Sequence, residues 1–84
     1  MRRYDQPMAT EPLQALLERA FPDATELHVQ DRTGGGDHFQ VTVVSPRFNG
    51  LSLVEQHRLV YDALEGPMAD GTIHELRITT RGET

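Results

Sequence analysis

Apolar residues recur at the spacing of one helix face in residues 10–21. Thr10 is the expected N-cap, and Pro12 falls in the first turn, where its missing N–H costs nothing. The apolar positions follow at i, i+3, i+4, i+7 and i+8, and they are Leu13, Leu16, Leu17, Ala20 and Phe21. This spacing predicts an amphipathic helix with one buried face.

A second helix is predicted over residues 52–65. Ser52 and Glu55 have the spacing of a capping box, and Gly66-Pro67 is expected to end the helix. Its apolar face is expected to consist of Leu53, Val54, Val60, Tyr61 and Leu64.

Alternation of apolar and polar residues predicts three strands. The first two, residues 25–31 and 39–44, are separated by a glycine-rich turn and should form an antiparallel hairpin. The third covers residues 73–79, in which His74, Leu76 and Ile78 share one face.

The element order of helix, strand, strand, helix, strand defines the fold class. A strand–helix–strand crossover usually leaves its two strands parallel, so the third strand should run parallel to the second. We therefore expect an α/β domain with a three-stranded mixed sheet and both helices on one face. Residues 10–84 would form this single domain, and residues 1–9 would be a flexible tail.

Composition restricts the location and the chemistry. The 84 residues carry a net charge of −5 and include no cysteine. The chain therefore has no thiol nucleophile, no thiolate ligand and no disulfide that would argue for secretion. With neither a signal peptide nor an apolar stretch long enough for a membrane span, we expect a cytoplasmic protein.

Two histidines are the candidate metal ligands. His38 follows three glycines just before the second strand, and His74 stands at the start of the third. Adjacent parallel strands begin at the same end of a sheet, about 4.8 Å apart, so the two imidazoles should meet at one rim. The glycines predict a pliable loop that lets His38 reach a metal shared with His74.

Three stretches of the chain closely resemble the BolA family. They are Val-Val-Ser-x-x-Phe-x-Gly at residues 43–50, His-Arg-x-Val-Tyr at residues 57–61 and Ile-His at residues 73–74. The resemblance covers residues 13–79, nearly the whole predicted domain. It implies a fold like the second class of KH domains, in agreement with the topology above, and it implies no catalysis.

The resemblance also implies a partner and a cofactor. Members of the family pair with monothiol glutaredoxins and share a [2Fe-2S] cluster with the glutaredoxin and glutathione. The histidine matching His74 is a ligand there, and a histidine or cysteine at the position of His38 is the second. Because this chain has no cysteine, we expect it to hold no cluster alone. Without its partner, it is expected to be a monomer or weak homodimer. The implied role is an adaptor in iron–sulfur cluster handling or in iron and redox sensing.

The chain departs from the family pattern in three places. Gln56 stands where many members have arginine or lysine, and Glu75 follows the Ile-His pair where the residue is often small. Many members also continue into a turn containing proline and tryptophan and a short last helix, whereas this sequence stops at Thr84. If that tail helps to hold the glutaredoxin, the heterodimer here would be weaker or differently shaped.

A nucleic-acid-binding transcriptional regulator is the alternative that the KH-like fold leaves open. Arg47 and Arg58, on either side of the start of the second helix, would supply a small basic patch. KH domains clamp nucleotides with a Gly-x-x-Gly loop, which this sequence lacks. The acidic balance also disfavours this reading, because non-specific nucleic-acid affinity comes mainly from neutralising phosphates.

Overall fold

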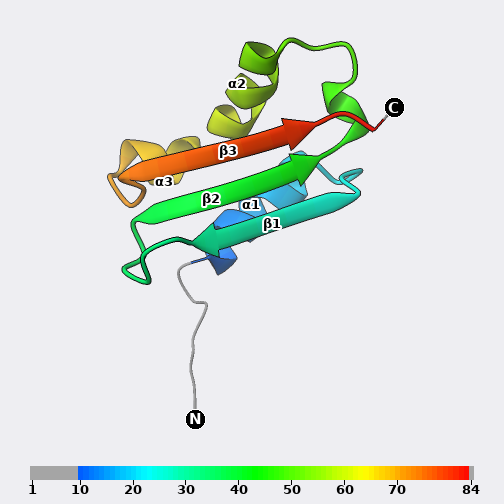
Figure 1. Ribbon diagram of the computed structural model, residues 1–84. Helices are drawn as coiled ribbons and strands as arrows, with labels where there is room; N and C mark the ends of the chain where they lie inside the picture. The colour runs from blue at the N-terminus through cyan, green and yellow to red at the C-terminus, as the bar shows by residue number, and fades with distance from the viewer. Residues whose placement is uncertain (1–9, 84) are drawn as a thin grey trace.

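The elements follow one another along residues 10–83, the part of the chain that this computed structural model describes. They are α1 (Glu11–Ala20), β1 (Glu26–Asp31), β2 (His38–Val44), the 3-10 turn η2 (Pro46–Phe48), α2 (Leu53–Ala63), α3 (Glu65–Ala69) and β3 (Glu75–Arg81) (Figure 1). The tail expected over residues 1–9 lies outside the described residues. No helix within residues 10–83 is long and apolar enough to cross a membrane.

The sheet has the strand order β1-β2-β3, which confirms the predicted topology. β1 runs antiparallel to β2, with Glu26 opposite Val44, and β3 runs parallel to β2, with His38 opposite Glu75. The helices cover one face of this sheet (Figure 1). The crossover through α2 and α3 therefore brings the starts of β2 and β3 to the same end of the sheet.

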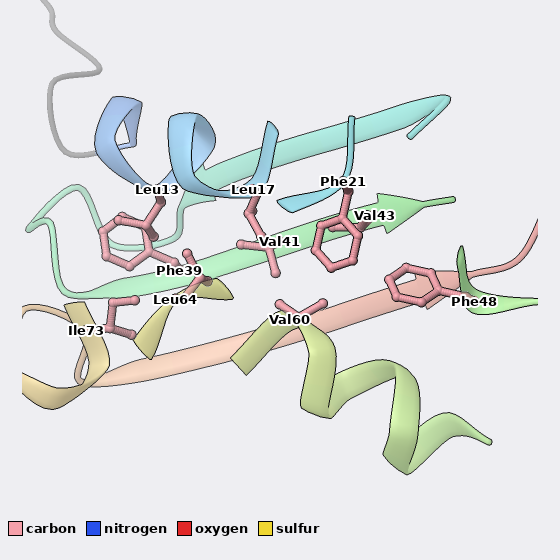
Figure 2. Close-up of a cluster of buried hydrophobic side chains, with 10 residues drawn as sticks. All are labelled: Leu13, Leu17, Phe21, Phe39, Val41, Val43, Phe48, Val60, Leu64 and Ile73. Atoms are coloured by element: carbon pink, nitrogen blue, oxygen red, sulfur yellow. The ribbon is translucent and has the colours of Figure 1, made fainter. Parts of the chain in front are cut away.

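The core lies between the sheet and the helices. In β2 the buried residues alternate, and Phe39, Val41 and Val43 are fully covered. The helices and loops that pack on them contribute Leu13, Leu17, Phe21, Phe48, Val60, Leu64 and Ile73 (Figure 2). This cluster fixes β2, and with it the end of the sheet where the candidate ligands lie.

The apolar face predicted for α2 is correct for only part of the helix. Val60 and Leu64 are fully buried, but Leu53, Val54 and Tyr61 are 60%, 68% and 43% exposed. Leu53 lies two turns before Val60, and this first part of α2 runs past the edge of the buried cluster (Figure 2). Val54 and Tyr61 lie seven residues apart, on a helix face that is turned away from the core.

Gly66-Pro67 does not end the helical segment, contrary to the sequence-based expectation. α2 ends at Ala63, and both residues lie inside α3. Pro67 occupies the first turn of α3, where a helix has no use for the missing N–H. The dipeptide thus belongs to the start of a new short helix. The capping box of α2 is confirmed, since Ser52 and Glu55 bond each other's backbone N–H groups reciprocally.

Candidate metal-ligand site at the start of β2 and β3

The two candidate ligands lie side by side at one end of the sheet. The rings of His38 and His74 are 6.4 Å apart between centroids and nearly perpendicular, at 84°. The side chain of His38 is 35% exposed and that of His74 is 65% exposed. The predicted meeting of the two imidazoles is confirmed, and both can be reached from outside the molecule.

The backbone around each histidine differs from the prediction. His38 is the first residue of β2 and not a loop residue, so pairing with β3 fixes its position. β3 begins at Glu75, two residues later than predicted, because Ile73 turns into the core at the end of the preceding loop. His74 therefore lies outside the strand and points toward solvent, where the sequence suggested the apolar face. The backbone N–H of His74 donates to the backbone oxygen of Asp37, 2.8 Å away.

The glycine-rich turn before His38 is organised by one carboxylate. Asp31 accepts backbone N–H groups from Thr33 at 3.3 Å, from Gly34 at 2.9 Å and from Gly36 at 3.0 Å. Gly34 and Gly36 have φ angles of 80° and 79°, a conformation that glycine adopts without steric cost. The turn expected to be a pliable arm is thus an ordered, hydrogen-bonded structure.

The carboxylate of Asp37 lies between the two imidazoles. Its Oδ1 is 3.0 Å from Nδ1 of His38, and its Oδ2 is 3.4 Å from Nδ1 of His74. The hydrogen bond with His38 lowers the pKa of Asp37 below its usual value despite partial desolvation, and electrostatic attraction to His38 and His74 lowers it further. The sequence did not lead us to expect that Asp37 contacts both histidines. The available signal was an aspartate directly before the candidate ligand His38.

A second carboxylate stands on the other side of His38. Oε1 of Glu75 is 3.8 Å from Nε2 of His38 and 3.5 Å from Nη1 of Arg32. The Arg32–Glu75 pair joins the end of the β1–β2 hairpin to the start of β3. His38 therefore has one carboxylate at each ring nitrogen, and the one at Nδ1 is closer.

The two imidazoles fit part of the ligand set of an iron–sulfur cluster. Two imidazoles on one iron are the arrangement found in Rieske-type [2Fe-2S] centres, in which thiolates hold the other iron. This chain has no cysteine. Within residues 10–83 no group of three or more histidine, aspartate or glutamate side chains is arranged to hold a metal ion. His38 and His74 would therefore supply two ligands of such a cluster and not its whole coordination sphere.

The two arginines proposed for nucleic-acid binding lie in different surroundings. Nη1 of Arg47 donates to the backbone oxygen of Ala20 at 3.2 Å, and its guanidinium lies 5.8 Å from the ring centre of Phe21. Arg58 lines a separate hollow on the exposed face of α2 with Val54, His57 and Tyr61. Arg47 therefore contacts the end of α1, and the two arginines line different hollows.

The fold is that of the BolA-like class of proteins. The family model described as BolA-like protein matches residues 18–84. The chain therefore belongs to the BolA family.

Individual relatives agree with this assignment. The chain is 39% identical to BolA-like protein 1 of Mus musculus, over 82% of this chain and 54% of that protein. It is 47% identical to a BolA-like protein of Dictyostelium discoideum, over 61% of this chain and 45% of the relative. The matched regions thus span about half the length of these relatives. The solved structure of BolA1 from Arabidopsis thaliana is similar with a TM-score of 0.80 at 28% identity, covering 94% of each chain.

Proposed function

We propose that this chain is a non-enzymatic adaptor that binds a monothiol glutaredoxin and shares a [2Fe-2S] cluster with it and glutathione. His38 and His74 are the ligands that it contributes. The role of the complex is the handling of iron–sulfur clusters or the sensing of iron and redox state.

The observation that carries this proposal is the pairing of His38 with His74. Residues far apart in sequence place two partly exposed imidazoles 6.4 Å apart at one end of the sheet. Neutral imidazole is a good ligand for iron, and exposure at a rim allows a second protein to approach. Membership of the BolA family supports the same reading.

The absence of cysteine explains why a partner is required. Thiolates are the usual ligands of [2Fe-2S] clusters, and this chain has none to offer. In the proposed complex, the glutaredoxin and glutathione supply the thiolates for the second iron. The chain alone should therefore hold no stable cluster.

The proposal is tested by anaerobic reconstitution with iron and sulfide, followed by visible absorption and circular dichroism. The protein alone should give no stoichiometric [2Fe-2S] spectrum. The mixture with a monothiol glutaredoxin and glutathione should give one that co-elutes with both proteins. His74→Ala should remove or alter that spectrum. A stoichiometric cluster on the lone chain, or no co-elution with the glutaredoxin, would contradict the proposal.

The nucleic-acid-binding alternative has less support. Arg47 is engaged with the end of α1, and the hollow that it lines also contains Arg19 and Asp62. The net charge of −5 opposes binding to phosphates. The adaptor function is therefore better supported than nucleic-acid binding.

A further inference from the structure

The carboxylate of Asp37 lies next to both candidate ligands, and in each case it faces the Nδ1 atom of the imidazole ring. Asp37 directs Oδ1 to Nδ1 of His38 at 3.0 Å, with hydrogen-bond geometry, and Oδ2 lies 3.4 Å from Nδ1 of His74. Asp37 leaves Nε2 of both rings uncontacted, and the carboxylate of Glu75 lies 3.8 Å from Nε2 of His38. Both contacts are made at Nδ1, but only the contact to His38 has hydrogen-bond geometry.

The chemistry of the carboxylate decides which nitrogen of His38 carries the proton. An ionised carboxylate can only accept hydrogen bonds, so Nδ1 must be the donor. In a neutral imidazole with a proton on Nδ1, the free lone pair is on Nε2. Histidines that bind metals commonly donate their other ring N–H to a carboxylate, which fixes the tautomer and the ring orientation.

We propose that Asp37 is a positioning residue for His38, which holds the proton of its imidazole on Nδ1 and so presents Nε2 to iron. Its other oxygen, 3.4 Å from Nδ1 of His74, favours the same tautomer there through its charge. The proposal rests on the proposed cluster-sharing function. It adds that the ligating atom is selected within this chain before any partner binds. The effect should be larger at His38, where the hydrogen bond is formed.

Glu75 supplies an internal contrast to Asp37. Its carboxylate is 3.8 Å from Nε2 of His38 and also forms an ion pair with Nη1 of Arg32, 3.5 Å away. If this contact dominated, the proton of a neutral His38 would sit on Nε2. Removing Asp37 and removing Glu75 should therefore move the tautomer of His38 in opposite directions.

Loss of the Asp37 side chain should leave the fold intact. The backbone oxygen of Asp37 accepts N–H groups from His74 at 2.8 Å and from Glu75 at 3.2 Å. These bonds do not depend on the side chain. Should Asp37→Ala nevertheless fail to fold, Asp37→Asn preserves the size of the side chain. Its amide can either accept from or donate to Nδ1 and so no longer enforces one tautomer.

The first arm of the test reads the tautomer directly in the free protein. Nitrogen NMR of histidine-labelled protein at about pH 8, where imidazole is ordinarily neutral, distinguishes Nδ1–H from Nε2–H. Wild-type His38 should be mainly Nδ1–H, Asp37→Ala should shift it toward Nε2–H, and Glu75→Gln should not. Asp23→Ala, the same substitution in the turn after α1 at the opposite end of the sheet, should have no effect. A wild-type His38 that is mainly Nε2–H, or a tautomer unchanged by Asp37→Ala, overturns the proposal.

The second arm measures cluster release from the complex with a monothiol glutaredoxin. Loss of a partner that orients a ligand typically weakens metal binding about 10- to 100-fold, so Asp37→Ala should release the cluster at least about 10-fold faster. Asp23→Ala should match the wild type. Equal lifetimes for Asp37→Ala and wild type would overturn the inference and leave the adaptor function standing. A wild-type chain that forms no shared cluster would overturn the adaptor function, and the ligand role of Nε2 with it.

Discussion

The rings of His38 and His74 meet edge to face, 6.4 Å apart between centroids, at the end of the sheet where two parallel strands begin. The meeting follows from the crossover through α2 and α3, which returns the chain to the start of β2. No local sequence pattern around either histidine requires it. The relationship is therefore a product of the topology, and the proposed function depends on it.

Burial along α2 leads to a matched pair of stability predictions. Leu64→Ala should lower the free energy of unfolding by about 2–5 kcal/mol, because Leu64 is fully buried. Leu53→Ala, the same substitution at the first residue of α2, should change it by no more than about 0.5 kcal/mol, because Leu53 is 60% exposed. Urea denaturation of the two variants measures both values. Equal losses would contradict the placement of the first turn of α2 outside the core.

The turn after α3 should contribute to acid sensitivity. Hydrogen bonds from the side chain and the backbone N–H of Thr72 hold the pKa of Asp70 below its usual value. A carboxyl with a depressed pKa in the folded state stabilises the protein above the unfolded pKa, near 3.8, and the stabilisation is lost as the pH falls through the folded pKa. Asp70→Asn should therefore flatten the decline in unfolding free energy below about pH 4. Identical pH profiles for variant and wild type would rule out this contribution.

Binding to nucleic acid should be weak. At physiological salt the dissociation constant for random-sequence DNA should exceed about 10 μM, because the chain is acidic and has no phosphate-clamping loop. Fluorescence anisotropy with a labelled duplex measures this. Submicromolar, sequence-dependent binding that Arg58→Ala abolishes would favour the regulator over the adaptor.

Most of the fold could be predicted because its signals are either local or topological. The helix face around Leu13 and Leu17 and the alternation in β2 come directly from periodicity. The parallel pairing of β2 with β3 follows from the crossover rule, and it placed His38 and His74 at one rim.

Two features were not predicted correctly, the structure at Gly66-Pro67 and the position of Asp37, because their sequence patterns occur in more than one structural context. Gly66-Pro67 is typical both of a helix end and of the first turn of a new helix, and residue types alone do not distinguish the two. The role of Asp37 depends on side-chain directions, which follow from the turn that Asp31 holds together. Neither property is encoded in the spacing of residue types.

Substitution of His38 should change the shared cluster according to the ligand introduced. His38→Cys should retain the cluster, because a thiolate also binds iron, and should lower its reduction potential because it adds a negative charge. His38→Ala should leave an exchangeable ligand on the iron and a shorter-lived cluster. Potential and lifetime are measured for the wild type and both variants with the same glutaredoxin. Indistinguishable values for all three would mean that His38 is only a surface residue.

The most direct measurement counts the histidine nitrogens on the cluster. This chain is labelled with ¹⁵N-histidine, combined with unlabelled monothiol glutaredoxin and glutathione, and the reduced cluster is studied by pulsed electron paramagnetic resonance. The wild type should show two directly bound ¹⁵N nuclei, and His38→Ala and His74→Ala should each show one. A cluster without ¹⁵N coupling from this chain, or with a coupling that survives the loss of both histidines, would contradict the account.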